Sequence, residues 1–196
     1  MMPENEPAPR PTPGKRQASA QSLRWSTRQL TTMALLMAVG LILSFVEFPL
    51  LPGTDFLKFD ASSVAALLGG FSYGPGSGCV IGILVAWIHG LFNGNLAGAL
   101  MNSVVVIAFV LPAAFAYRRN PSIATKIIGL FISSICMITV AILMNLLVTP
   151  TYMGAPLEAV IALISPVLLP FNILKALINA VLAFILERSL RSFLAR

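Results

Sequence analysis

Long apolar runs, separated by short polar segments, dominate the pattern of residues along this chain. The hydrocarbon core of a membrane is about 30 Å thick, so about twenty helical residues span it. A shorter apolar helix that lies between longer ones can also cross the membrane, either tilted or with the bilayer thinned around it. The pattern predicts an all-α integral membrane protein with six transmembrane helices, at residues 30–50, 61–73, 79–92, 97–117, 127–148 and 170–189.

Two segments lie outside these helices. Residues 1–22 are rich in Pro, Ala, Ser and charged residues, and such a composition cannot bury enough apolar area to offset the entropy of ordering. We therefore expect a disordered tail at residues 1–22 and a six-helix membrane domain at residues 23–196. Pro166 and Pro170 interrupt the last apolar stretch. Because proline is favoured in the first turn of a helix, we expect the sixth helix to begin at Pro170 and residues 155–169 to form a loop or a short helix.

Cations are distributed unequally between the two ends of the predicted helices. Eleven of the thirteen Lys and Arg residues lie on the side of the tail: Arg10, Lys15, Arg16, Arg24, Arg28, Arg118, Arg119, Lys126, Arg188, Arg191 and Arg196. The opposite side carries four acidic residues and two cations: Glu47, Asp55, Asp60, Glu158, Lys58 and Lys175. Loops rich in Lys and Arg stay in the cytoplasm, and six helices return the chain to its starting side. Both termini are therefore predicted to be cytoplasmic.

The composition excludes several classes of function. Hydrophobic residues make up 57% of the chain and charged residues 10%, whereas soluble domains carry about 25% charged residues, so a soluble enzyme is excluded. The net charge of +6 arises at helix ends and forms no basic stripe with interleaved aromatics, so no nucleic acid partner is expected. Cys79 and Cys136 lie in apolar runs without a CxxC pair. They are expected to be small buried side chains, with no redox or metal-binding role.

Strongly polar side chains within the apolar runs gather in the outer halves of the predicted helices: His89, Asn93, Asn102, Asn145, Asn172 and Lys175. A buried polar group is costly unless it is hydrogen-bonded, so this clustering predicts one polar pocket that opens to the outside. Asn172 and Lys175 share a helix face, which Asn179 continues one turn deeper.

Each of these residues also has a less specific interpretation. Lys175 could instead extend to the membrane interface, and Asn102 could link two helices by a hydrogen bond. His89 has no Cys, His or acidic residue at ligand spacing, so a packing role is preferred to a metal site.

Small residues and absent motifs add to this picture. Ala34 and Ala38 place two small side chains on one face of the first helix, which permits another helix to approach closely in lipid. Glycines at positions 74, 76, 78 and 82 predict a tight turn and a close contact between the second and third helices. The sequence contains no GxxxxGK[ST] nucleotide motif and no HExxH motif. A polar pocket without an energy source predicts a solute-binding subunit that depends on a partner. A small channel or facilitator that needs no partner is the alternative.

Several segments carry a family resemblance: FLKFDAS at 56–62, ALLGGF at 66–71, GP at 74–75, LPAA at 111–114, YRR at 117–119, MIT at 137–139 with Asn145, PTY at 150–152 and PFNILK at 170–175. In order and spacing, across residues 29–190, they resemble the riboflavin-binding S components of energy-coupling factor (ECF) vitamin importers. The second helix begins with SSVA at residues 62–65, where that family commonly has Ser-Asp-x-Pro. Thiamine or pantothenate is therefore the alternative ligand.

The resemblance implies a binding subunit in a bacterial or archaeal cell membrane that captures riboflavin from outside without chemistry, cofactor or metal. It implies that Asn145, Asn172 and Lys175 hydrogen-bond the flavin ring, and that Lys58 and Asp60 lie in a loop that closes the pocket. Asparagine supplies a donor and an acceptor together, and lysine supplies donors, which suits the carbonyl and N–H groups at the edge of the ring. Asn102 is a further candidate because of its position alone.

The resemblance also implies protein partners. They are a transmembrane coupling protein and two cytoplasmic ATPases, and the coupling protein is expected to contact Ala34 and Ala38. The alternative is that these two alanines pack inside the six-helix bundle.

Overall fold

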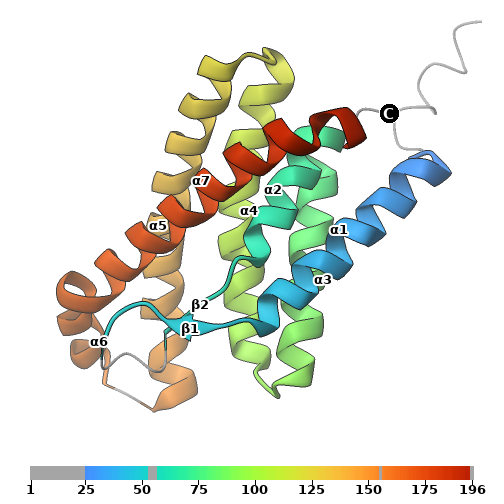
Figure 1. Ribbon diagram of the computed structural model, residues 1–196. Coiled ribbons are helices and arrows are strands. Elements are labelled where there is room, and N and C mark those ends of the chain that lie inside the picture. Colours follow the sequence, from blue (N-terminus) through green and yellow to red (C-terminus); the bar gives the residue numbers. More distant parts are fainter. Residues whose placement is uncertain (1–24, 53–56, 155, 195–196) are drawn as a thin grey trace, which may run out of the picture.

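The computed structural model describes residues 25–52, 57–154 and 156–194, so the tail expected at residues 1–22 lies outside the described residues. Figure 1 shows a bundle of long helices in which the start of the first helix and the end of the last lie at the same end. The elements follow in the order α1 (Thr27–Phe45), β1 (Phe48–Pro49), β2 (Lys58–Phe59), α2 (Ser62–Tyr73), α3 (Pro75–Phe92), α4 (Leu96–Arg119), α5 (Ile123–Met153), α6 (Leu157–Leu163), η2 (Ile164–Leu168) and α7 (Leu169–Leu194).

Helix α1 begins three residues earlier than the apolar pattern predicts, because polar residues cap it. The Ser26 hydroxyl accepts a hydrogen bond from the backbone N–H of Gln29 at 3.2 Å. The Gln29 side chain in turn accepts one from the backbone N–H of Ser26 at 3.0 Å. This reciprocal pair is a capping box, which satisfies two N–H groups that the helix itself cannot. The helix ends at Phe45, five residues before the predicted end at Leu50.

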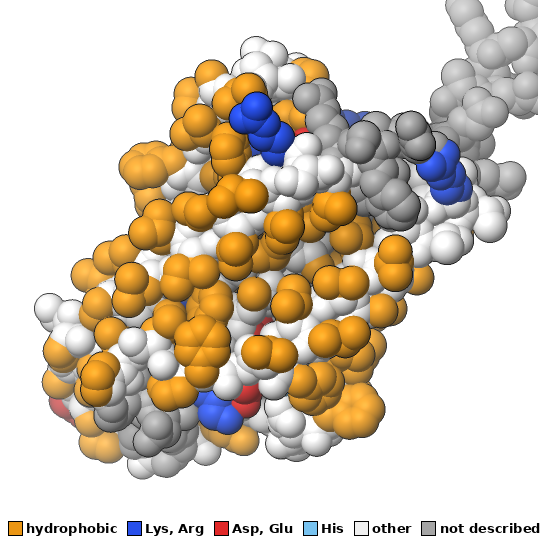
Figure 2. Space-filling view, viewed as in Figure 1, with side chains coloured by type: hydrophobic (Ala, Val, Ile, Leu, Met, Phe, Trp, Pro, Cys, Tyr) orange, Lys and Arg blue, Asp and Glu red, His pale blue; other side chains and the backbone are white. Residues whose placement is uncertain are grey.

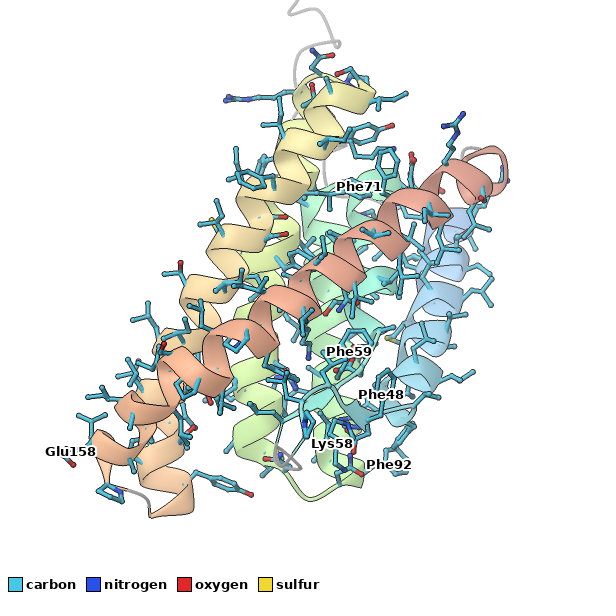
Figure 3. All side chains as sticks on the ribbon, turned by 60° about the vertical axis from the view of Figure 1, so that its left-hand side comes forward. Phe48, Lys58, Phe59, Phe71, Phe92 and Glu158 are labelled. Carbon is cyan, nitrogen blue, oxygen red and sulfur yellow. The ribbon has the colours of Figure 1, made fainter. Side chains whose placement is uncertain are left out.

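A short β-hairpin between α1 and α2 departs from the predicted all-α fold. Strands β1 and β2 pair antiparallel, with Phe48 opposite Phe59 and Pro49 opposite Lys58. The rings of Phe48 and Phe59 lie 5.4 Å apart between centroids, and Figure 3 shows them beside each other. Two-residue strands are too short to give an alternating pattern, so the sequence could not reveal them.

The turn between α2 and α3 confirms the tight turn that the glycines predict. Gly74 adopts φ +96°, a left-handed conformation that side chains other than that of glycine disfavour. At Gly78 a Cβ atom would lie 2.5 Å from the carbonyl oxygen of Ala66. Helices α2 and α3 therefore meet backbone to backbone, and only glycine at position 78 permits that approach.

The last apolar stretch is one continuous helical segment, so the predicted break before Pro170 is wrong. Helix α6, the five-residue π-helix η2 and α7 follow without interruption from Leu157 to Leu194. Pro166 lies inside η2. Proline removes a backbone hydrogen bond and clashes with the preceding turn of an α-helix, and the wider π-turn relieves that conflict.

Helix α5 also continues beyond its predicted end at Val148. It includes Pro150 and ends at Met153, where Gly154 adopts φ +66°. A glycine in the left-handed conformation is a common end signal for a helix, and here it takes precedence over the proline.

Five described helical segments are long and apolar enough to cross a membrane: α1, α3, α4, α5 and the segment from α6 through α7. Helix α2 has 12 residues, or about 18 Å. Its residues from Val64 to Phe71 are all buried, so α2 forms the centre of the bundle. Around it, hydrophobic side chains cover most of the face in Figure 2, and the visible charged side chains lie mainly toward its two ends.

The two cysteines are free thiols and are half-buried rather than fully buried. Both lie on long helices, Cys79 on α3 and Cys136 on α5.

Candidate functional site

A cavity of about 590 Å³ lies between the hairpin segment and helices α3, α4, α5, α6 and α7. All six residues that the sequence identified as candidates for binding line this one cavity: Lys58, Asp60, Asn102, Asn145, Asn172 and Lys175. They come from positions up to 117 residues apart in the chain. The structure thus brings the six candidates together at one cavity, while the role of each side chain in binding stays a prediction.

Asp60 and Lys175 form an ion pair in the wall of the cavity. The Lys175 ammonium lies 3.1 Å from Oδ2 of Asp60, and both side chains are largely buried. Lys175 therefore does not extend to the membrane interface. The other carboxylate oxygen of Asp60 accepts hydrogen bonds from the backbone N–H of Ser62, at 3.0 Å, and from the Ser62 hydroxyl. The carboxylate thus joins the start of α2 to α7.

The environment of Asp60 also sets its protonation. Burial alone would raise the pKa of this carboxyl, but the positive charge of Lys175 and the hydrogen bonds from Ser62 and Lys175 together outweigh burial. The pKa of Asp60 therefore lies below its ordinary value, which favours the charged form of this carboxyl.

Asn179 supports this pair from one turn deeper on α7. Its Nδ2 donates to the carbonyl oxygen of Lys175 at 2.9 Å and to that of Asp60 at 3.5 Å. Its side chain is fully buried, and its Oδ1 has no hydrogen-bond partner among the residues that the structure describes. Asn179 continues the polar face of Asn172 and Lys175, as the spacing predicts.

Lys58 pairs with Glu47, which the sequence had placed on the outer side without assigning it a role. Their side chains lie 2.6 Å apart and tie the residue before β1 to β2. His89 faces the same carboxylate at 3.8 Å, lies 2.8 Å from the Asn93 amide and contacts the Phe45 ring. Glu47 and His89 both line the cavity. Their proximity depends on the hairpin, so the sequence carried no signal for it.

The described part of the chain contains no group of three or more His, Cys, Asp or Glu side chains that could hold a metal ion. His89 packs between a ring, an amide and a carboxylate.

Asn145 on α5 and Asn172 on α7 line the cavity from two different helices. The Nδ2 of each donates to the backbone carbonyl four residues earlier, at 2.8 Å in both cases. The Oδ1 of Asn145 also accepts from the Thr149 hydroxyl at 3.2 Å. An asparagine amide has two N–H donors and an oxygen with two lone pairs. Each side chain therefore keeps hydrogen-bonding capacity for a ligand after these contacts are made.

Apolar side chains complete the cavity, among them Met137, Val148, Leu168 and Phe171. Asn102 lines the cavity from an exposed position on α4. It therefore does not lie buried between two helices, as a residue that links two helices by a hydrogen bond would. A cavity with apolar walls and a few convergent polar groups is the usual form of a small-molecule site.

Ala34 and Ala38 lie on the exposed side of α1, while Met33, Leu36 and Gly40 face the bundle. The two alanines therefore do not pack inside the six-helix bundle. Their contact with a partner stays a prediction.

Comparisons with known proteins agree with this architecture. The family of ECF transporter substrate-specific components matches residues 28–187. The riboflavin transporter RibU of Staphylococcus aureus (strain TCH60) is 30% identical over 190 residues, which are 93% of this chain and 98% of that protein. The riboflavin transporter FmnP of Bacillus subtilis (strain 168) is 27% identical over 165 residues, 79% of this chain and 87% of that protein.

A solved structure agrees as well. The S component of a bacterial ECF transporter superposes with a TM-score of 0.75 at 29% identity, over 86% of this chain and 98% of that chain. The family match covers the bundle from Arg28 to Glu187, and it includes every residue that lines the cavity. This chain is therefore a member of the ECF transporter substrate-specific components, the S components.

Proposed function

We propose that this S component captures riboflavin from outside the cell and binds it in the cavity of about 590 Å³. The observation that carries the proposal is that six polar side chains expected at a flavin site line one cavity. Its volume falls within the range of small-molecule sites, roughly 300–1,000 Å³. Relatives named as riboflavin transporters, similar over most of their length, support the same ligand.

The charge balance of the cavity supports a neutral ligand. Lys58 is paired with Glu47, and Lys175 with Asp60, so the fixed charges in the wall cancel in pairs. Riboflavin is uncharged, whereas thiamine carries a cationic ring and pantothenate carries a carboxylate. A charge moved from water into a partly apolar site without a partner is costly. The pairing therefore favours riboflavin over these two vitamins.

Three side chains are assigned to the flavin ring under this proposal. Asn145 and Asn172 offer amides from two different helices, and each suits a ring edge that presents carbonyl acceptors beside an N–H donor. The Lys175 ammonium has three donors, one of which is directed at Asp60. The remaining donors are available for a ring carbonyl. Asn102, at the exposed rim on α4, is assigned to the ribityl hydroxyls.

The hairpin segment is assigned to closing the cavity over the ligand. Lys58 lies in β2 and Asp60 directly after it, and both line the cavity. Their partners, Glu47 and Lys175, belong to different parts of the fold. The pair of Lys58 and Glu47 would then hold the hairpin together, while the pair of Asp60 and Lys175 would hold it against α7 once the flavin has entered.

Six membrane crossings with both termini in the cytoplasm complete the proposal. The five apolar helical segments supply five crossings, and α2 supplies the sixth. Because its central residues are buried in protein, a helix of about 18 Å need not match the thickness of the lipid. The exposed side chains of Arg28, Arg118 and Arg188, near the chain ends and the α4–α5 turn, support a cytoplasmic side there. The protein would then be a multi-pass protein of a bacterial or archaeal cell membrane.

Transport against a gradient requires energy, and the chain carries no nucleotide-binding motif. We assign the energy to a transmembrane ECF coupling protein and two cytoplasmic ATPases. The S component itself is a binding protein and catalyses no reaction, and riboflavin is its cargo rather than a cofactor. Ala34 and Ala38, exposed on α1, are the proposed contact with the coupling protein.

Ligand extraction followed by mass spectrometry of the purified full chain tests the proposal directly. Riboflavin is expected to co-purify, and added riboflavin should lose fluorescence on binding at submicromolar concentration. Recovery of thiamine or pantothenate instead would replace the ligand, and the absence of flavin binding would contradict the proposal. Solute flux into liposomes that contain this chain alone would favour a facilitator that works without partners.

A further inference from the structure

A buried ion pair lies away from the cavity and takes no part in the proposed site. Lys126 on α5 and Glu187 on α7 form a salt bridge, and each residue is about 5% exposed. The Tyr117 hydroxyl donates to the other carboxylate oxygen of Glu187 at 3.4 Å. Three aromatic rings surround the ammonium, with centroids 4.7 Å (Tyr117), 5.7 Å (Phe71) and 5.8 Å (Phe184) from Nζ. Side chains from α2, α4, α5 and α7 thus converge on one cation.

This cluster is remote from the ligand along both helices that carry it. Lys126 lies eleven residues before Met137, which lines the cavity from α5, and Glu187 lies twelve residues after Lys175 on α7. These separations correspond to about 16–18 Å along a helix. Figure 3 shows Phe71, a member of the cluster, well away from Lys58 and toward the opposite end of the bundle.

Local helix electrostatics do not explain either charge. Lys126 lies in the first turns of α5, where the helix dipole disfavours a cation. Replacing a buried ion pair by apolar residues is often neutral or stabilising, so overall stability does not require the pair either. An ion pair differs from an apolar contact between the same two helices in one respect. It favours a single arrangement of the helices, because the charges are satisfied in that arrangement alone.

The ion pair of Lys126 and Glu187 fixes the position of helix α7. This helix carries Asn172 and Lys175, and it packs mainly against α2 and α5. One ion pair fixes it at each end: Lys175 with Asp60 beside the cavity, and Glu187 with Lys126 at the far end. Removing the far contact would leave α7 able to rotate or slide about the near one.

We propose that Lys126 and Glu187 are positioning residues for ligand binding: their buried ion pair sets the rotation and height of α7, so that Asn172 and Lys175 face the cavity. This inference rests on the proposed capture of riboflavin. Breaking the pair releases the wall of the cavity formed by α7, and the bound flavin then leaves faster although no residue that contacts it has changed.

The test compares Glu187→Gln and the double variant Lys126→Gln/Glu187→Gln with wild type, as full chains in lipid nanodiscs. The double variant removes both charges, so neither remains buried without a partner. Couplings between distant sites correspond to about fivefold to 150-fold in affinity. We expect flavin dissociation to accelerate by a factor in that range in both variants. Arg188→Gln, which neutralises an exposed residue next to Glu187 on α7, is the matched control and should release flavin at the wild-type rate.

A second measurement needs no ligand. Hydrogen exchange of the flavin-free protein should rise in α7 around Asn172 and Lys175 in the double variant, and should be unchanged in Arg188→Gln. If wild type binds no flavin, the proposed function fails, while the exchange measurement still decides the role of the ion pair.

A purely structural pair gives a different result. The unfolding temperature of the flavin-free protein would then fall, while the flavin dissociation rate and the exchange in α7 would stay at wild-type values. That outcome overturns the inference. Should both glutamine variants fail to fold, Glu187→Asp keeps the charge but shortens its reach, and a wild-type release rate in that variant overturns the inference equally.

Discussion

Asp60 and Lys175 are separated by 115 residues in the chain, and their side chains meet at 3.1 Å in the wall of one cavity. Asp60 also receives the backbone N–H of Ser62 at the start of α2. A single carboxylate therefore connects the end of the hairpin, the central helix and the helix that carries Asn172. A displacement of Lys175 therefore displaces the hairpin through Asp60, and a displacement of the hairpin displaces Lys175.

Replacement of Lys175 by alanine should weaken riboflavin binding and leave Asp60 buried without its counter-ion. Loss of a hydrogen bond to a desolvated partner corresponds to about 1–3 kcal/mol, or roughly fivefold to more than a hundredfold in affinity. Fluorescence titration measures this loss. The double variant Lys175→Ala/Asp60→Asn removes the unpaired charge and should regain stability without regaining affinity. If Lys175→Ala bound riboflavin as wild type does, the assignment of Lys175 to the ligand would be wrong.

Asn172→Ala should lower the affinity by a similar factor, about 1–3 kcal/mol, because its amide is one of the polar groups that face the cavity from α7. Asn120→Ala is the matched control, since Asn120 is exposed in the turn between α4 and α5. Titration of both variants under the same conditions separates a local effect from a general one. Equal affinities for the two variants would remove Asn172 from the site.

The pH dependence of stability should reveal the Asp60 carboxylate. Its pKa is lowered in the folded protein, so its contribution to the free energy of unfolding is fully present above the unfolded pKa of about 3.9. That contribution is lost as the pH falls through the folded pKa, because the unfolded chain then binds the proton more readily than the folded one. The difference in unfolding free energy between wild type and Asp60→Asn should therefore be constant between about pH 5 and 8.

Below about pH 4 the same difference should shrink, because the unfolded chain takes up a proton at position 60 that the folded protein takes up only at lower pH. Chemical unfolding at a series of pH values measures it. If the difference in unfolding free energy between wild type and Asp60→Asn varied between pH 5 and 8, a group other than Asp60 would be responsible for the variation.

Much of the helical architecture could be predicted from the sequence, because long apolar runs have few structural solutions in a membrane. The polar pocket could be predicted too, since Asn145, Asn172 and Lys175 occupy the same half of their helices. The hairpin escaped prediction because β1 and β2 are held by tertiary contacts such as that between Phe48 and Phe59, which a two-residue pattern does not encode.

Two further features were missed for a different reason. The continuous segment from α6 to α7 was missed because a π-turn accommodates Pro166, whereas propensity treats proline as a break. The pair of Lys126 and Glu187 was missed because Lys126 lies near the end of a predicted helix, as topology-setting cations do, and no pattern in the sequence assigns a role to Glu187. In the structure this lysine is buried against the acid. A buried pair joins two helices across 61 residues, and charge counts along the chain contain no information on that contact.

The close approach of α2 and α3 predicts a sharp difference between two neighbouring glycines. At Gly78 an added Cβ would lie 2.5 Å from the Ala66 carbonyl oxygen, whereas at Gly76 it would meet nothing within 4 Å. Gly78→Ala should therefore destabilise the protein by about 1–3 kcal/mol through forced backbone movement, while Gly76→Ala should be neutral or slightly stabilising. Thermal unfolding in detergent compares the two. Equal stabilities of the two variants would contradict the close approach of α2 and α3 at Gly78.

The proposed contact with the coupling protein predicts that binding and transport can be separated. Ala34 and Ala38 are exposed on α1, on the side opposite its buried residues, so tryptophan at either position adds bulk outside the bundle rather than within it. Two helices approach closely in lipid when small side chains line their interface, and Ala34→Trp or Ala38→Trp would hold a partner helix away. Riboflavin binding by the isolated chain should stay at the wild-type level, while ATP-dependent uptake and co-purification with the coupling protein should be lost.

Ile132→Trp, at an exposed position on α5, adds the same bulk elsewhere and should leave uptake intact. Normal uptake by the two α1 variants would place the partner on another face, and uptake lost in all three would show that added bulk, rather than its position on α1, disturbs transport.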